Sequence, residues 1–119
     1  MKLTNLQLIN SEQALIKLKS QELPILVAYK LNKAIKEIAE KIAFINEQKN
    51  DIIKKYGKEE HGSYSIAQDD KENVDKFLKD FKEVLDIEEE VNVEPFDLKD
   101  FENVKLSSDE FEMISFLFE

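Results

Sequence analysis

His61 is the only histidine in the chain, and its neighbours include Glu59, Glu60 and Tyr64, a group that could perform acid–base or metal chemistry. A general base needs a positioned partner and a pocket. His61 instead lies in the least periodic part of the sequence, between two stretches with helical spacing. We therefore interpret His61 as a solvated loop residue and predict no catalytic residue.

Asp69, Asp70 and Glu72 form a second group, with oxygen ligands of the kind that bind divalent metals. An EF-hand loop places such ligands at alternating positions around a central glycine, and that register is missing. The same residues suit the N-cap and first turn of a helix. The sequence also lacks cysteine, a phosphate-binding glycine loop and a nucleophile elbow. We predict no metal, no cofactor and no enzymatic activity.

Glu88, Glu89, Glu90 and Glu94 belong to a run of acidic residues that could form a functional surface. One interpretation is an ordinary solvated face. The other is a surface that imitates nucleic-acid phosphates and occupies a basic groove of another protein, which requires carboxylates on one face at phosphate-like spacing. The sequence leaves both interpretations open.

The segment 111–118 is apolar at six of its eight positions, which is more than one helix face needs to cover a core. These residues either pack between other elements of their own chain or contact a partner or a second copy. The predicted partner-binding residues are Phe111, Met113, Ile114, Phe116, Leu117 and Phe118.

One long helix over about 24–56 gives the strongest periodic signal. Pro24 suits the first turn of a helix, and Gly57 suits the position after its end. The apolar positions recur every three or four residues, as in a coiled coil. They are Leu31, Ile35, Ile38, Ile42, Ile45, Ile52 and Tyr56.

A second helix over about 70–89 follows a loop over 57–69 that either forms a small hairpin or covers the helix ends. Its apolar face comprises Val74, Phe77, Leu78, Phe81, Val84 and Leu85. Two long apolar faces separated by a short connection favour an antiparallel α-hairpin. The three glutamates at 88–90 oppose the helix dipole, so we expect the second helix to end there.

The shorter elements are predicted from local signals. Leu6 and Leu8 alternate with polar residues, which indicates a short strand that pairs with 91–93. Ser11 is the expected N-cap of a short helix that ends near Ser20.

Two further signals lie near the C-terminal end of the sequence. A single helical turn is expected after Asp97. Ser107 followed by Glu110 is a capping-box pattern, which predicts a helix over about 108–118.

Composition agrees with a mainly α (α+β) fold: a long antiparallel α-hairpin with a two-stranded β ribbon and small flanking helices. The 119 residues include only two glycines and two prolines, and we expect a single domain over 1–119. The longest apolar run, 25–29, is too short to span a membrane. The first ten residues lack the pattern of a signal peptide, so we expect a soluble protein of the cytoplasm.

The net charge of −9 is unevenly distributed. Residues 1–60 contain 11 lysines and 8 acidic residues, whereas 61–119 contain 6 lysines and 18 acidic residues. All 17 basic residues are lysine, and both this composition and the acidic half disfavour direct nucleic-acid binding. The lysine-rich face of the long helix (Lys30, Lys33, Lys36 and Lys41) is the segment that a nucleic acid could contact.

Several segments together resemble small proteins encoded by bacteriophages and prophages of Gram-positive bacteria. The matching segments are 1–10, 14–18, 21–24, 46–48, 54–57, 93–96 and 106–110. The resemblance implies a phage origin and a location in the host cytoplasm or in the virion. It supplies no catalytic residue.

The leading hypothesis is a non-catalytic phage-type protein that binds a protein partner, as an assembly or structural accessory or as a host-directed factor. A second copy of the chain is one such partner. The alternative is an acidic inhibitor, acting as a nucleic-acid mimic, of a host nucleic-acid-binding or defence enzyme.

Overall fold

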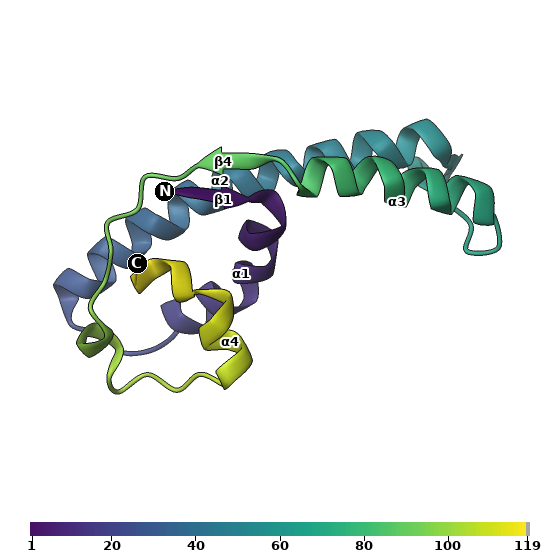
Figure 1. The fold of residues 1–119 in the computed structure, drawn as a ribbon. Coiled ribbons are helices and arrows are strands. Elements are labelled where there is room, and N and C mark those ends of the chain that lie inside the picture. Colours follow the sequence, from purple (N-terminus) through teal and green to yellow (C-terminus); the bar gives the residue numbers. More distant parts are fainter. Residues whose placement is uncertain (119) are drawn as a thin grey trace.

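The structure, a computed structural model, describes residues 1–118 and has a long α-hairpin with small β ribbons and flanking helices (Figure 1). This confirms the predicted mainly α fold class. The strands and helices are β1 (Lys2–Thr4), α1 (Asn5–Lys19), α2 (Ile25–Tyr56), β2 (Lys58–Glu60), β3 (Ser63–Ser65), α3 (Lys71–Leu85), β4 (Glu88–Glu90) and α4 (Ser108–Met113), with the 3₁₀ turns η1 (Leu98–Phe101) and η2 (Ser115–Phe118).

The helix α2 is continuous over 32 residues, as its periodicity predicted. At about 1.5 Å of rise per residue it is about 48 Å long, and the molecule measures 49 × 27 × 24 Å. The Cα radius of gyration is 17.2 Å, whereas a compact chain of this length would have about 13.5 Å. The molecule is therefore elongated, and α2 runs along its whole length (Figure 1).

The segment 57–69 contains a β-hairpin in which β2 and β3 pair antiparallel, with Lys58 opposite Ser65. Its two turn residues, His61 and Gly62, have φ angles of 52° and 83°. Positive φ at both central positions is the geometry of a type I′ turn, which matches the twist of a two-stranded ribbon. Of the two arrangements left open by the sequence, this segment forms the hairpin.

Gly57 follows the last residue of α2, as its position in the sequence predicted. Its φ is −95°, which is extended backbone, so a positive φ is not what requires a glycine here. The residue is constrained by space instead. A Cβ at this position would lie 2.6 Å from the carbonyl oxygens of both Ile53 and Ser65, because the hairpin folds directly onto the end of the helix.

The N-terminal elements differ from the prediction. Thr4, rather than Ser11, caps α1, and it forms a capping box with Gln7. Leu6 and Leu8 are therefore helical, and Ser11 lies buried within α1, where its hydroxyl donates to the carbonyl of Leu8 at 2.7 Å. The strong local cap at Thr4 outweighs the two-residue alternation that predicted a strand.

The β ribbon joins β1 to β4, with Lys2 opposite Glu90 and Thr4 opposite Glu88. The predicted pairing with 91–93 is therefore wrong. The predicted end of the second helix at 89 is wrong as well, because α3 ends at Leu85 and the backbone of 88–90 bonds to β1 instead.

The C-terminal segment begins with the predicted capping box of Ser107 and Glu110. The helix ends at Met113, however, and continues as the 3₁₀ turn η2 rather than as α-helix to 118. An α-helix advances 100° per residue and would point Phe116 away from the core face that holds Ile114 and Leu117. The tighter turn brings all three side chains into the core.

All of the fully buried apolar side chains among the described residues lie in one half of the molecule. They come from β1, α1, α2 up to Ile45, the segment after β4, and the C-terminal turns. We call this half the base. Residues 46–86, which we call the stalk, contain no fully buried side chain. In the stalk, α3 packs against α2 through half-buried residues such as Phe77 and Phe81.

One ion pair links α4 to α1 in the base. Lys17 Nζ donates to Glu110 Oε1 at 2.8 Å, and the same oxygen accepts the backbone N–H of Ser107 at 2.9 Å. The hydrogen bond from Lys17, followed by that from Ser107, lowers the pKa of Glu110 to about 2. Both bonds stabilise the carboxylate, and the bond from Lys17 helps to fix α4 against α1.

We expect this contact to depend on pH. Because the folded pKa of Glu110 lies below the ordinary value of 4.5, its stabilising effect is complete above pH 4.5 and is lost as the pH falls towards 2. An NMR titration of the Glu110 carboxyl carbon measures the pKa directly. In Lys17→Met the pKa should rise towards 4.5, and an unchanged pKa in that variant would refute the assigned cause.

Candidate partner-binding surfaces

The structure divides the six predicted partner-binding residues of the C-terminal segment. Ile114, Phe116 and Leu117 are enclosed by their own chain, so they are unavailable to a partner in this conformation. Phe111 and Met113 are each 42% exposed, and Phe118 is half-buried. The predicted contact set therefore narrows to these last three residues.

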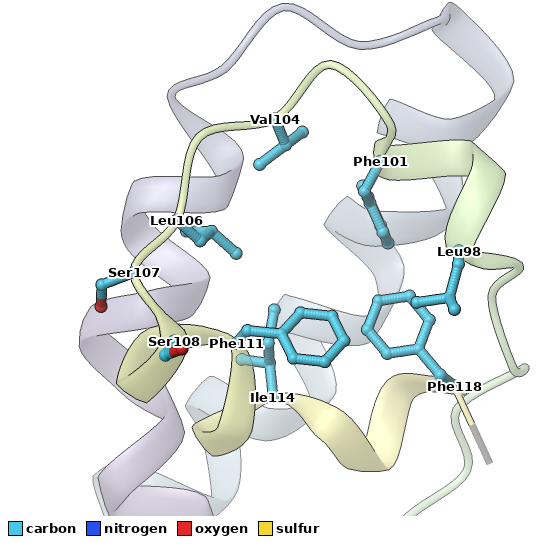
Figure 2. Close-up of a pocket in the computed structure, with 9 residues that line it drawn as sticks. All are labelled: Leu98, Phe101, Val104, Leu106, Ser107, Ser108, Phe111, Ile114 and Phe118. Atoms are coloured by element: carbon cyan, nitrogen blue, oxygen red, sulfur yellow. The ribbon is translucent and has the colours of Figure 1, made fainter.

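Phe111 and Phe118 form part of an apolar pocket between α4, η2 and the segment 98–106 (Figure 2). The cavity has a volume of about 390 Å³. The rings of Phe111 and Phe118 stack with centroids 5.4 Å apart, and Phe101 meets Phe118 edge-on at 5.6 Å. No charged side chain lines the pocket in the described part of the chain. It has the chemistry to accept an apolar side chain but few polar groups to orient a small molecule.

A longer hollow follows one side of α2. Three cavities of about 760, 490 and 360 Å³ adjoin one another along the helix. The first two share Lys33, Glu37 and Asn92, and the last two share Glu40 and Lys41.

We call these three cavities together the α2 groove. It extends along the helix from Leu26 to Phe44, which corresponds to about 27 Å at the rise of an α-helix.

The opposite wall of the α2 groove is the chain segment 91–95, which is tied to the helix by polar contacts. The backbone N–H of Asn92 donates to the Glu37 carboxylate at 2.9 Å. Lys30 donates to the carbonyl of Pro95 and lies 4.4 Å from the centre of the Phe96 ring. These contacts fix the distance between the two walls, so the groove is a built feature of the fold.

One end of the α2 groove is strongly apolar. Ile25, Leu26 and Tyr29 are 84%, 80% and 66% exposed, and Leu26 and Tyr29 line the cavity of about 760 Å³. We call these three residues the apolar tip. From the sequence, the run 25–29 was interpreted only as too short for a membrane span. The apolar character of this run was the available sequence signal for the tip, because the run precedes the buried stripe of α2, which starts at Leu31.

The other end of the groove combines charged, aromatic and amide groups. It is lined by Asn5, Glu40, Lys41, Phe44, Ile45 and Glu89. The side chain of Asn5 is deeply buried, and the residue is only 5% exposed. Its Nδ2 donates to the carbonyl of Val84 at 2.8 Å, whereas its Oδ1 is buried without a donor among residues 1–118. An acceptor left in this state costs about 1–3 kcal/mol, and no sequence signal pointed to it.

The four predicted acidic surface residues do not share one face. Strand alternation puts Glu89 opposite Leu3 on the inner side of the ribbon, where it is half-buried. Glu88 and Glu90 are exposed on the other side, and Glu90 lies 3.0 Å from the amino group of Met1. Glu94 is exposed on the wall of the α2 groove.

The residues with potential acid–base or metal chemistry have local roles. His61 is exposed in the hairpin turn. Asp70 caps α3 by accepting from Asn73, and Glu72 pairs with Lys76 at 3.2 Å. Residues 1–118 contain no group of three side chains placed to hold a metal ion. Within the same range, no helix has the length and apolar character needed to cross a membrane.

The chain was compared with protein families, with curated proteins and with solved structures. No protein-family model, no curated protein and no solved structure matches the chain.

Proposed function

We propose that this chain is a non-catalytic, phage-type protein that binds a protein partner through the α2 groove. It would act as an assembly or structural accessory or as a host-directed factor, in the host cytoplasm or in the virion. The observation that carries the proposal is the apolar tip at one end of the groove. The phage setting comes from the sequence resemblance alone.

The apolar tip supports protein binding because its three side chains are exposed to solvent, and burying them against a partner would contribute favourable free energy. Ile25 and Leu26 are neighbours in the first turn of α2, and Tyr29 lies one turn further on. Burying one such side chain fully contributes about 1.5–3 kcal/mol. A contiguous exposed apolar group beside a groove is typical of a protein interface. Tyrosine is also enriched among the residues that dominate binding energy.

The dimensions of the α2 groove suit a segment of a protein rather than a small molecule. An extended peptide rises about 3.3 Å per residue, so about eight residues would fill a groove of about 27 Å. The walls carry lysines, glutamates and Asn92 between the apolar tip and Phe44. This combination of apolar ends and a polar middle supports a partner segment with matched side chains.

The alternative function, an acidic inhibitor that imitates nucleic acid, receives less support. Mimicry requires a row of carboxylates on one face. The ribbon places Glu88 and Glu90 on one side and Glu89 on the other. The net charge of −9 still favours a basic partner, whichever surface it contacts.

The proposal predicts that polar substitution of the apolar tip abolishes partner binding. In the double variant Ile25→Ser, Leu26→Ser, we expect capture of the partner to fall by at least about tenfold, because two exposed anchors are lost. Affinity capture from infected Gram-positive host cells, with light scattering to detect self-association, provides the measurement.

The matched control is Ile16→Ser with Leu78→Ser, which removes two apolar side chains of 58% and 55% exposure outside the groove. The control should retain the same partner or oligomer as the unmodified chain. Equal capture and equal oligomeric state for both double variants would overturn the proposed role of the tip.

A further inference from the structure

We propose that two copies of this chain form a dimer in which the apolar tip of each copy enters the apolar pocket of the other. The apolar pocket is the cavity of about 390 Å³ whose lining includes Leu98, Phe101, Phe111 and Phe118. The inference rests on the proposed function, because the contact uses the apolar tip at the end of the α2 groove. It adds the identity of the partner and the surface that receives the tip.

The apolar tip stays exposed because the fold fixes it away from the core. Ile25 and Leu26 belong to the first turn of α2, where the backbone N–H of Ala28 donates to the carbonyl of Pro24 at 2.9 Å. A side chain on a formed helical turn cannot move to another face of the helix. The two side chains therefore remain 84% and 80% exposed, and their burial requires another molecule.

The apolar pocket has the chemistry and the volume to receive the tip. Its apolar side chains point towards one shared space (Figure 2). Leu98 and Phe111 are 63% and 42% exposed, so the walls of the pocket reach solvent. An apolar cavity of about 150 Å³ is sufficient to hold benzene. The pocket, with about 390 Å³, therefore has room for the side chains of Ile25 and Leu26.

The charges around the two surfaces have opposite signs. Residues 25–36, which contain the tip, include three lysines and no acidic residue. Lys33 and Lys36 are exposed one and two turns beyond Tyr29, on the same side of α2. Residues 97–112, which supply most of the pocket, include six acidic residues and two lysines. The exposed acidic side chains among them are Asp97, Glu102, Asp109 and Glu112. Entry of the tip into the pocket therefore brings lysines to an acidic rim.

This local match identifies a second copy as the occupant of the pocket. The net charge of −9 repels two copies at long range. Surface charges are screened beyond about 8 Å at physiological salt, however, so the charges that face each other at the contact have the larger effect. Both matched surfaces belong to one chain, so a second copy supplies them without any further protein.

The tip and the pocket lie at the same end of the molecule. Lys30, the residue after Tyr29, has its Nζ 4.4 Å from the centre of the Phe96 ring. Phe96 lines a cavity together with Leu98 and Phe118, and these two residues also line the apolar pocket. Two copies that meet at this end can make the contact twice, related by a two-fold axis. Such a dimer is closed, so we expect two chains rather than an open series of chains.

Light scattering coupled to size-exclusion chromatography tests the inference on the full chain. The unmodified chain should have the mass of two copies, with a dissociation constant in the micromolar range because each contact is small. The tip variant (Ile25→Ser, Leu26→Ser) and the pocket variant (Leu98→Ser, Phe111→Ser) should each dimerise at least about tenfold more weakly. The control double variant outside the groove should remain dimeric.

An equal mixture of the tip variant and the pocket variant identifies which surfaces meet. The pocket variant still has an intact tip, and the tip variant still has an intact pocket. One of the two contacts can therefore form in a mixed pair, and the mixture should contain a complex of two chains at a concentration where neither variant dimerises alone. A dimer made by two tips would give no recovery, because no mixed pair has two intact tips. Recovery also verifies that both variants fold.

Reversing two lysine charges tests the rim without changing an apolar side chain. Lys33→Glu with Lys36→Glu should weaken dimerisation by about fivefold, because acidic side chains would then face an acidic rim. Lys54→Glu with Lys58→Glu is the matched control, since it makes the same change of net charge at exposed positions of the stalk. The control should weaken dimerisation less, and the difference between the two variants measures the effect of the local charges.

Three results would overturn the inference. They are a mass other than that of two chains for the unmodified protein up to millimolar concentration, unchanged dimerisation of the pocket variant, or no recovery in the mixture. Partner capture tests the proposed function separately. If the unmodified chain is monomeric and the tip variant loses capture of another protein, only the dimer is refuted. If the tip variant keeps both its dimer and its capture, the role of the tip in the proposed function is refuted as well.

Discussion

Replacing Leu117 with alanine is expected to lower the free energy of unfolding by about 2–5 kcal/mol, the usual range for a buried leucine. Leu117 is fully buried in the base, and its carbonyl accepts the backbone N–H of Phe96 at 2.7 Å. The cavity left by truncation would lie where the C-terminal turn meets the core. Urea denaturation followed by circular dichroism measures the change.

Met113→Ala is the matched control, because Met113 lies four residues earlier and is 42% exposed. We expect this control to change the free energy of unfolding by less than about 1 kcal/mol. Equal effects of the two substitutions would contradict the placement of η2 in the core. Deleting 108–118 removes three buried side chains together, so that deletion should unfold the base rather than report on a partner surface.

Replacing Gly57 with alanine is expected to destabilise the protein by about 1–3 kcal/mol, as overpacking does. The new Cβ would lie 2.6 Å from two backbone oxygens, one of α2 and one of β3. Neither oxygen can rotate away as a flexible side chain would. The hairpin must therefore move off the end of the helix, and thermal unfolding with NMR of the Tyr64 region should detect both effects.

Lys58→Ala is the control for Gly57→Ala, because Lys58 is the next residue and its side chain is exposed. A stability equal to that of the unmodified chain is expected for this control. If Gly57→Ala were equally harmless, the close approach of the hairpin to α2 would be refuted.

The long helices could be predicted from sequence because their signals are repeated many times. The stripe from Leu31 to Ile45 recurs at helical spacing over several turns, so one ambiguous position does not change the outcome. The capping box at Ser107 was equally clear, since two residues at fixed spacing satisfy each other.

The short elements were harder to predict because competing local signals had similar strength. Thr4 and Ser11 are both good N-cap residues, and the structure forms the capping box at Thr4, where β1 ends. The glutamates at 88–90 have poor strand propensity, and their pairing with β1 depends on residues more than 80 positions away.

The candidate site could be predicted only in part. The apolar run at 25–29 was visible, but the segment that forms the other wall of the groove becomes its neighbour only through folding. Asn5 and Phe44 had no sequence signal, because an unpaired amide oxygen is a property of the packed structure. Of the C-terminal residues, the sequence could not separate those that enter the core from those that stay outside.

Because every fully buried side chain of residues 1–118 lies in the base, the length of the stalk can vary independently of the rest of the molecule. Adding one heptad to each helix of the stalk would extend it by about 10 Å without altering a buried contact. A fluorophore or peptide tag inserted between His61 and Gly62 would likewise sit at the remote end, on an exposed turn. Such a handle would allow immobilisation or distance measurements that leave the α2 groove open.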